Sequence, residues 1–551
     1  MNTPILSYDA DKERLKLTFP EWDQDSVAAI QQMLLCWYRR GTSLYSFPVA
    51  LAKIEAMEIL KEITIDPSVK EFDMEQSTLQ WTGTDGIEDS TLFPDQVIPT
   101  NLLYKRDKAI VTAAPGTGKT IMSAVALRER YHKLAVVVAP LSSLASWEHE
   151  LKIWYTDPLL GRDIDVEVIT WRKLPDSFYF SSIYDQRVIL ISPQVMHALV
   201  EQGRVDELLG DNRPYDQILI LDESYLYKNR KADRQDDASS LASNFRTVWL
   251  LSGMPVSRFN DDLFAQLHIL FPSVFRSYWK FASRYCLLKD TVWGIDVVND
   301  LPYAARRIKG DFNDILIECS FPETVPDWLP VEIPCQMTDR QEKIYENLRD
   351  KLIVDAGTLG ALKPLALKTI LSLSGRLLQV ASNPLLVEGV DSSGKWERLL
   401  ELVPRNELPA LIWINYIKTG EVLLERLKAL GYRVSLLAGN CKPKDRKTMV
   451  DSFQAGELDL LIIHPAVGKY SHTLTAAKTA YYLERNFDRE AYYQSLFRVR
   501  RIISKHACKI VYLLSTYQTG KQTIDHVVHR LLLESSRKAQ KLTVGKLIGS
   551  I

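Results

Sequence analysis

Short apolar segments alternate with helix-favouring segments over two stretches of the 551-residue chain. In the first stretch the apolar segments are residues 109–112, 134–139, 165–169, 188–191, 217–221 and 247–251. In the second stretch they are residues 411–414, 433–437, 458–463, 479–483 and 509–514. Because apolar strands that alternate with helices are typical of parallel sheets covered on both faces, the pattern predicts two α/β lobes.

The remaining segments have other patterns. Residues 256–404 look mainly helical and include an amphipathic stretch at 339–354. The amino-terminal region mixes a predicted strand at 14–19 with predicted helices at 26–39 and 49–62, and a Gly/Asp/Thr-rich linker follows at 81–90. We therefore predict a small α+β accessory domain at 1–90, a first lobe at 91–270, a helical region at 271–404, a second lobe at 405–520 and a basic tail at 521–551.

Composition narrows the functional classes only slightly. Hydrophobic residues make up 46% and charged residues 25% of the chain, as in ordinary globular proteins. A net charge of −1 gives no global attraction to nucleic acid, so such binding needs local basic patches. The six cysteines have no zinc-type spacing. The amino terminus lacks a signal-peptide pattern and no apolar run is long enough to cross a membrane, so we expect a soluble, cytoplasmic protein.

The strongest local motif is a glycine-rich segment, A-A-P-G-T-G-K-T, at residues 113–120. It lies between a predicted strand and a predicted helix, which is the context that a phosphate-binding loop requires. Glycines let backbone N–H groups approach phosphate oxygens, Lys119 supplies positive charge, and the Thr120 hydroxyl can bind Mg²⁺. The predicted nucleotide contacts are Pro115, Gly116, Thr117, Gly118, Lys119 and Thr120. Alanine replaces the usual first glycine at Ala113, and the alternative is an ordinary glycine turn with a surface lysine.

An apolar strand that ends in two acids, Asp222 and Glu223, follows about a hundred residues later. At the end of a strand beside a phosphate loop, Asp222 can hold Mg²⁺ and Glu223 can polarise the attacking water. An Asp-Glu pair after a strand is otherwise a common helix cap. Its pairing with Lys119 favours an ATP-hydrolysing site.

Hydrolysis also needs positive charge on the leaving oxygens, and the segment at residues 494–501 can supply it. At helical spacing Gln494, Arg498 and Arg501 lie on one face. The alternative for this segment alone is a basic surface helix.

The order of these motifs resembles the superfamily-2 ATPases and, within them, the Swi/Snf family of DNA translocases. Residues 92–96 (L-F-P-D-Q) resemble the adenine-reading glutamine motif, which implies a nucleotide contact by Gln96. Residues 136–147 resemble the P-L-S-L-L-x-x-W segment. Residues 222–229 (D-E-S-Y-L-Y-K-N) are similar to the D-E-A-H-R-L-K-N box, and residues 251–255 (L-S-G-M-P) to the T-G-T-P segment.

Further matches lie in the middle of the chain and in the second lobe. Residues 271–275, 281–285 and 377–386 resemble the P-x-x-F, F-x-x-R-Y and L-R-Q-I-C-N-H-P-x-L segments, and residues 494–502 follow Q-x-x-x-R-x-x-R-I. Two departures concern the second lobe. Only Gly468 remains of the glycines in G-G-x-G-L-N-L-T-A-A, and Ile503 and Ser504 replace a Gly-Gln pair.

This resemblance implies two RecA-like lobes that hydrolyse Mg-ATP and move along double-stranded DNA, with branched or single-stranded DNA as the alternative substrates. Asp222, Glu223, Lys119, Gln494, Arg498 and Arg501 are the predicted catalytic residues, with Thr120 and Asp222 as magnesium ligands. Predicted contacts to nucleic acid are Ser142, Ser143, Trp147, Lys228, Lys469, His472 and Thr473. A basic cluster of Lys442, Lys444, Arg446 and Lys447 is a further candidate, although a solvated helix start is the favoured explanation of this cluster.

Several alternatives stay open. A strand-separating DNA or RNA helicase shares the hydrolytic motifs, and a motor subunit of a restriction or defence complex would need a partner chain. A non-hydrolysing scaffold could bind through the acidic amino-terminal region, which is also where we expect any protein partner. Residues 44–48 (L-Y-S-F-P) resemble the end of a substrate-recognition module of annealing helicases, although a plain adaptor is as good an interpretation. The compact length suits a bacterial or phage source.

Overall fold

The computed structural model describes residues 92–543 except 131, 156–164, 172–185, 211–216, 292–293, 323, 359–373, 440 and 466–472, together with five strands in the first 91 residues. The chain divides into two compact units, residues 1–320 with 538–551, and residues 321–537. Within the described part, no helix has the length and apolar character needed to span a membrane.

The amino-terminal strands form one five-stranded sheet in the order β3-β4-β2-β1-β5. These strands are β1 (Ile5–Asp9), β2 (Arg14–Thr18), β3 (Trp37–Tyr38), β4 (Leu44–Pro48) and β5 (Thr64–Ile65). The predicted strand at 14–19 is confirmed as β2. The predicted helix at 26–39 is wrong for its last residues, since Trp37 and Tyr38 pair with β4. Its other residues, the predicted helix at 49–62 and the linker at 81–90 lie outside the described residues.

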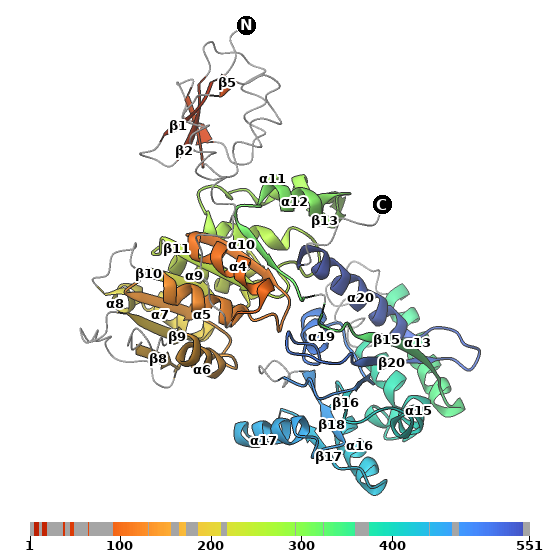
Figure 1. Cartoon of the computed structure of the whole chain (residues 1–551). Coiled ribbons are helices and arrows are strands. Elements are labelled where there is room, and N and C mark those ends of the chain that lie inside the picture. The colour runs from red at the N-terminus through yellow and green to blue at the C-terminus, as the bar shows by residue number, and fades with distance from the viewer. Residues whose placement is uncertain are drawn as a thin grey trace. The chain divides into compact units, whose positions relative to one another are not determined.

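The first unit contains a seven-stranded parallel sheet in the order β14-β6-β11-β10-β7-β9-β8 (Figure 1). Its strands are β6 (Lys108–Ala113), β7 (Leu134–Val138), β8 (Asp165–Ile169), β9 (Arg187–Ile191), β10 (Gln217–Leu221), β11 (Thr247–Ser252) and β14 (Leu316–Cys319). All six strands predicted in the first alternating stretch are therefore confirmed to within one or two residues.

Helices cover both faces of this sheet because alternate side chains of each buried strand point to opposite faces. In β10, Ile218 and Ile220 belong to one apolar cluster with residues of α5 (Lys119–Glu129) and α6 (Leu144–Trp154). Leu219 and Leu221 belong to the other cluster, with α7 (Pro193–Glu201), α9 (Asp233–Ala242) and α10 (Asp262–Leu270). Two complete cores thus fix the carboxyl edge of the sheet, where the predicted motifs lie.

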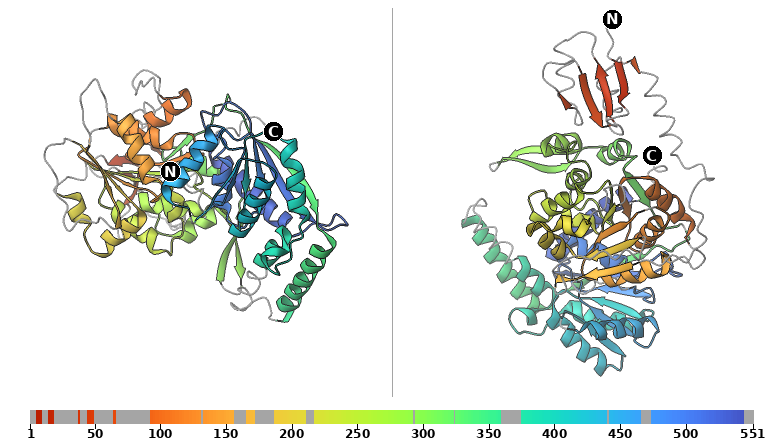
Figure 2. Two further views of the ribbon diagram at one scale, coloured as in Figure 1. Left: turned by 90° about the horizontal axis from the view of Figure 1, so that it is seen from below. Right: turned by 90° about the vertical axis from the view of Figure 1, so that its left-hand side faces the viewer.

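The rest of the first unit surrounds this framework. The helix α4 (Pro94–Lys105) packs on α5. The helix α8 (Val205–Leu209) lies between α7 and β10, and the short 3-10 helix η4 (Ser224–Tyr227) follows β10. A hairpin of β12 (Cys286–Thr291) and β13 (Gly294–Asp300) extends from α11 (Tyr278–Tyr285), beside α12 (Ala304–Asp311) (Figure 2). Because β12, β13 and β14 lie within residues 271–404, the prediction of a mainly helical segment there is only partly correct.

The second unit contains a six-stranded parallel sheet in the order β15-β20-β19-β16-β18-β17. Its strands are β15 (Leu329–Gln336), β16 (Ala410–Trp413), β17 (Val434–Leu437), β18 (Leu460–Ile463), β19 (Thr479–Tyr482) and β20 (Lys509–Thr516). Five of them confirm predicted strands. The sixth, β15, was not predicted, and it pairs along its whole length with β20.

Helices also surround the second sheet. They are α13 (Asp339–Thr358), η5 (Pro384–Leu386), α15 (Gly394–Leu402), η6 (Val403–Arg405), α16 (Ile417–Ala429), α17 (Pro443–Gln454), α19 (Arg489–Leu496) and α20 (Ile524–Thr543). The predicted amphipathic stretch at 339–354 is confirmed as α13. An ion pair between Lys395 and Asp525, both buried, attaches α20 to α15. The expectation of two RecA-like parallel-sheet lobes is confirmed.

Candidate functional site

The predicted phosphate loop connects β6 to α5 at the carboxyl edge of the seven-stranded sheet. Gly116 and Gly118 have φ angles of 90° and 92°, a left-handed conformation in which other residues are strained. The first N–H groups of a helix have no intrahelical partners and lie at the positive end of its dipole, so the start of α5 suits a phosphate group. Lys119 donates its Nζ to the Ala113 carbonyl at 3.0 Å and is thereby held across the loop.

Gln96, on α4, fixes the conformation of this loop from the side. Its Nε2 donates to the Thr117 carbonyl at 2.7 Å, and its Oε1 accepts the backbone N–H of Phe93 at 3.0 Å. The side chain is almost fully buried. A Cβ at Gly118 would lie 2.2 Å from Gln96 Nε2, so the glutamine packs directly on the glycine turn. Contact of Gln96 with a nucleotide base stays a prediction.

Asp222 follows β10 directly and is buried. Its Oδ2 accepts the indole N–H of Trp147 at 2.9 Å, and its Oδ1 accepts the backbone N–H of Glu223 at 2.9 Å. Burial raises the pKa of Asp222, while the Trp147 bond, the charge of Lys119 and the Glu223 N–H oppose that rise. Asp222 and Lys119 are therefore close enough to interact electrostatically, as their predicted roles require.

Glu223 has a φ angle of 49°, which places a non-glycine residue in the left-handed region. Such a backbone conformation costs on the order of 1–3 kcal/mol and persists where the surroundings determine it. Glu223 caps the amino end of η4, and its carbonyl accepts the Leu226 N–H at 2.9 Å. The strain coincides with the residue predicted to polarise water.

A third loop, after β11, contacts the first one. A Cβ at Gly253 would lie 2.9 Å from side-chain carbons of Pro115 and 3.5 Å from Lys119 Nζ. The strands β6, β11 and β10 are neighbours in the sheet, so their carboxyl ends bring residues 113–120, 252–257 and 222–223 to one edge. The sequence predicted that Asp222 lies beside the phosphate loop, and the structure adds the loop after β11 to the same edge.

These residues suit a magnesium ion bound with a nucleotide. Mg²⁺ is usually held by one or two protein oxygens together with water and substrate phosphates, so it needs no dedicated cluster of acids. Over the described ranges there is no group of three or more His, Cys, Asp or Glu that could hold a metal. Asp222 is a buried carboxylate with a raised pKa, and a cation beside it would offset its charge. The predicted ligand pair of Asp222 and Thr120 stays a prediction.

The predicted nucleic-acid contacts of the first unit differ in exposure. Ser142 and Ser143 are half-buried at the start of α6. Trp147 is 1% exposed and donates its indole N–H to Asp222, which favours a role in orienting that carboxylate, and its contact with nucleic acid stays a prediction. Lys228 is half-buried and donates to Ser257 Oγ at 2.8 Å, which connects the end of η4 to the loop after β11.

The predicted arginine segment of the second unit, residues 494–501, is not one continuous helix, although the sequence predicted one. Gln494 lies on α19, but the helix ends at Leu496, so Gln494, Arg498 and Arg501 do not share a helical face. Just past the helix, Phe497 packs on Trp328, with ring centroids 5.0 Å apart, and the Arg498 carbonyl accepts the Leu474 N–H at 2.9 Å, which is a bond outside the helix. Arg498 is only 8% exposed.

The segment beside it is only partly described. Thr473 is half-buried, next to the Leu474 that bonds Arg498. Lys469 and His472 lie outside the described residues, so their predicted roles stay open. In the basic cluster Arg446 donates to the carbonyls of Cys441 and Gly439 at 2.8 and 3.0 Å, which favours a structural role for that side chain at the start of α17.

Comparison with known families accounts for both units. The family model described as the SNF2-related domain matches residues 79–386, more than half of the chain, and the helicase conserved C-terminal domain matches residues 394–503. The chain belongs to the SNF2-related family. It is thus an ATPase of the helicase superfamily 2 type, as its motifs indicated.

Curated relatives of this SNF2-related chain are more distant. It is 22% identical to chromodomain-helicase-DNA-binding protein 8 of Homo sapiens over 79% of this chain and 18% of that protein. It is 25% identical to YwqA of Bacillus subtilis, named as a candidate ATP-dependent helicase/translocase, over 88% of this chain and 50% of that protein. The chain spans about a fifth of the length of the first curated relatives it matches.

Solved structures similar to the chain include the SWI2/SNF2 ATPase core of Sulfolobus solfataricus. The core in complex with dsDNA has 19% sequence identity and a TM-score of 0.36, covering 82% of this chain and 97% of that one. The core domain alone has 19% identity and a TM-score of 0.35, covering 86% of this chain and 93% of that one.

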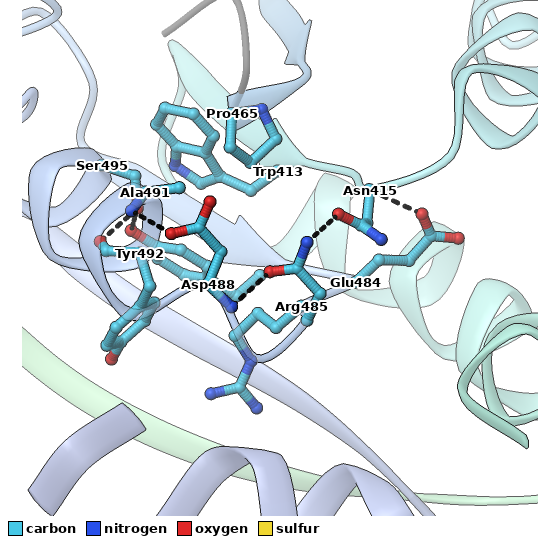
Figure 3. Close-up of a pocket in the computed structure, with 11 residues that line it drawn as sticks. Trp413, Asn415, Pro465, Glu484, Arg485, Asp488, Ala491, Tyr492 and Ser495 are labelled. Carbon is cyan, nitrogen blue, oxygen red and sulfur yellow. Dashed lines mark hydrogen bonds between the residues drawn. The ribbon is translucent and has the colours of Figure 1, made fainter. Parts of the chain in front are cut away.

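One buried acid of the SNF2-related second unit was not predicted. Glu484 follows β19, and its carboxylate accepts the hydroxyls of Ser382 and Thr419 at 2.5 and 2.6 Å and the N–H groups of Asn415 and Tyr416 at 2.7 and 2.9 Å. Of these four bonds, Figure 3 draws the one from Asn415. Burial raises the pKa of Glu484, and these four donors oppose the rise. An acid directly after an apolar strand is the same pattern that marked Asp222. Glu484 borders a small pocket at the ends of β16 and β19, lined also by Trp413 and Tyr482.

Proposed function

We propose that the chain hydrolyses ATP to move along double-stranded DNA, and that it thereby remodels protein-DNA or branched DNA complexes. The observation that carries this proposal is the convergence of three loops on one sheet edge, where Lys119 interacts electrostatically with Asp222 and lies close to Gly253. The phosphate-binding turn, the buried acid Asp222 and the loop after β11 are the parts that a nucleotide-driven motor needs. Membership of the SNF2-related family supports the same reaction.

In this proposal the phosphates bind the turn at Gly116 to Thr120. Backbone N–H groups and Lys119 neutralise the β- and γ-phosphates. Thr120 and Asp222 would hold Mg²⁺, which when bound offsets the charge of the phosphate oxygens. Glu223 orients and polarises the attacking water, and Gln96 keeps the turn in its binding conformation.

The second unit would supply the remaining positive charge. Gln494, Arg498 and Arg501 are assigned to the γ-phosphate in a closed arrangement of the two units, so that hydrolysis depends on closure. Removing an arginine of this kind can lower the rate by about 10³- to 10⁵-fold.

Duplex tracking would rest on contacts with the phosphate backbone, which carry no sequence information. Ser142 and Ser143 on the first unit, and Thr473, Lys469 and His472 on the second, are the proposed contacts. Lys228 is retained only as a secondary candidate because its ammonium already bonds Ser257. Among the alternatives, a strand-separating helicase uses the same ATP site, whereas a scaffold that only binds nucleic acid does not hydrolyse ATP.

The test measures phosphate release under four conditions: without nucleic acid, with duplex DNA, with single-stranded DNA and with RNA. We expect stimulation by duplex DNA, and no measurable turnover for Lys119→Ala or Glu223→Gln. Lys152→Ala, which removes an exposed lysine from the same unit, should have wild-type turnover. Displacement of a third strand from a triplex without unwinding of a fork supports translocation. Fork unwinding alone would favour the helicase, and absence of nucleic-acid-stimulated release would favour the scaffold.

A further inference from the structure

Two fully buried polar side chains lie directly behind the Asp222-Glu223 turn. Ser224, the first residue of η4, and Gln266, on α10, both have 0% exposure. Ser224 Oγ donates to Gln266 Oε1 at 2.7 Å, and Gln266 Nε2 donates to the Pro255 carbonyl at 2.7 Å. One amide group therefore joins the turn after β10 to the loop after β11.

The chemistry of the partners fixes the orientation of this amide. A proline carbonyl can only accept, so the NH₂ group of Gln266 must face Pro255. Its oxygen is then left to face Ser224, whose hydroxyl can donate. Because all these groups are buried, a missing partner would leave a polar atom without a hydrogen bond. The two hydrogen bonds of Gln266 therefore form or break together.

A second polar connection runs in parallel with the first. Lys228, at the end of η4, donates to Ser257 Oγ at 2.8 Å, and that hydroxyl donates to Asp262 Oδ2 at 2.8 Å. Asp262 also accepts the backbone N–H groups of Ser257 and Arg258 at 2.8 and 3.0 Å. Both ends of η4 are thus tied to the loop after β11 and to α10.

The loop that receives these bonds also contacts the phosphate loop. Gly253, two residues before Pro255, packs against Pro115 and lies close to Lys119. A shift of residues 253–257 is therefore passed to the phosphate loop on one side and, through Gln266, to the residue after Glu223 on the other.

We propose that Gln266 is a positioning residue for ATP hydrolysis. Its two hydrogen bonds make the turn at Glu223 and the loop from Gly253 to Pro255 move together. The inference rests on the proposed function, because Glu223 is assigned there as the residue that orients water. Gln266 itself touches no reacting atom. Its loss should lower kcat while leaving the KM for ATP nearly unchanged, since the phosphate loop still binds the nucleotide.

The test compares Gln266→Leu, Ser224→Ala and the double variant in duplex-stimulated ATP turnover. We expect each single variant to lower kcat about tenfold, and the double variant to be no slower than Gln266→Leu, because residues that act as one unit are not additive. Gln217→Leu is the matched control. Gln217 is also buried, but lies at the opposite end of β10, where its Nε2 donates to the Leu209 carbonyl at 3.3 Å. It should lower the melting temperature without lowering kcat.

Backbone hydrogen exchange of residues 223–227 and 253–257 supplies a reading that does not depend on turnover. Gln266→Leu should raise exchange in both segments together, and Gln217→Leu in neither. Wild-type turnover of Gln266→Leu, multiplicative effects of the two single variants, or faster exchange in only one segment would overturn the proposal. If the wild-type chain itself releases no phosphate, the proposed function fails, and the exchange experiment alone still decides whether the two segments are coupled.

Discussion

At the scale of single residues, Trp147 shows how a buried hydrogen bond tunes the candidate site. Its indole N–H stabilises the ionised form of Asp222, whose pKa burial raises. In Trp147→Phe this donor is lost and the pKa of Asp222 rises further, so the acidic limb of the turnover profile should move to higher pH. The pH dependence of kcat/KM measures that shift. Trp249→Phe is the control, because it loses an indole hydrogen bond of 2.9 Å to the Arg106 carbonyl instead. An equal shift of the acidic limb in this variant would contradict the explanation.

His132 makes the stability of the first unit depend on pH. Burial, opposed by its bond to the Arg130 carbonyl at 2.8 Å, lowers the pKa of His132 from its usual 6.5 to about 4. Between these values the unfolded chain binds a proton that the folded chain does not, so stability falls as pH falls. From pH 7.5 to 5.0 this residue alone should lower the free energy of unfolding by about 2 kcal/mol. Denaturant titrations of wild type and His132→Gln at both pH values measure this fall in the free energy of unfolding. An equal fall in both proteins would exclude His132 as its cause.

At the scale of elements, the phosphate loop depends on contact between α4 and the glycine turn. In Gly118→Ala the new Cβ would lie 2.2 Å from Gln96 Nε2, at a φ of 92° that alanine rarely adopts, so the turn or the glutamine must move. The KM for ATP should rise at least about tenfold because the N–H groups no longer converge. Gly203→Ala is the matched control, since its φ is 64° and its Cβ meets nothing within 4 Å. It should lower stability by about 1 kcal/mol and leave the KM unchanged.

Elements whose apolar pattern was continuous could be predicted from the sequence, and those that depend on a distant partner could not. Apart from Gln217, the buried strands β7 and β10 are runs of Val, Ile, Leu and Ala, and such apolar runs are identifiable in the sequence. The edge strand β15 has exposed and half-buried residues and two prolines, and only its pairing with β20 makes it a strand. Just past the end of α19 at Leu496, Phe497 likewise packs against Trp328, a partner far away in sequence.

At the scale of the whole molecule, motif order in the sequence located the residues of the site but not their supports. The phosphate loop and Asp222 lie on neighbouring parts of one sheet edge, as predicted. Gln266 escaped prediction because a lone polar residue in an apolar helix has no distinctive spacing. Glu484 escaped prediction because an acid after an apolar strand, the pattern that it shares with Asp222, is too common to mark a site by itself. Their importance comes from partners that the fold brings together, such as the Pro255 carbonyl and the Ser382 hydroxyl.

The arginines after α19 allow a test of whether the second unit completes the ATP site. Arg500 has a structural environment: its Nε donates to the Pro326 carbonyl at 3.0 Å, and its guanidinium lies 4.7 Å from the centroid of the Phe321 ring. Burial lowers the pKa of Arg500, although the charge of Asp327 opposes this. We therefore expect Arg500→Gln to lower the melting temperature of the full chain and to keep duplex-stimulated turnover within a few fold of wild type.

If Arg498 acts on the γ-phosphate, Arg498→Gln should lower turnover and leave the melting temperature of the full chain nearly unchanged. Turnover should fall by about 10³-fold or more, while the affinity for ATP, which the first unit supplies, changes little. Affinity is measured by titration with a non-hydrolysable ATP analogue, and turnover by phosphate release at saturating duplex DNA. Equal losses of turnover in Arg498→Gln and Arg500→Gln, each accompanied by a lower melting temperature, would mean that the segment only stabilises the second unit. Loss of turnover confined to Arg498→Gln, at unchanged nucleotide affinity, requires that the two units act together on one nucleotide.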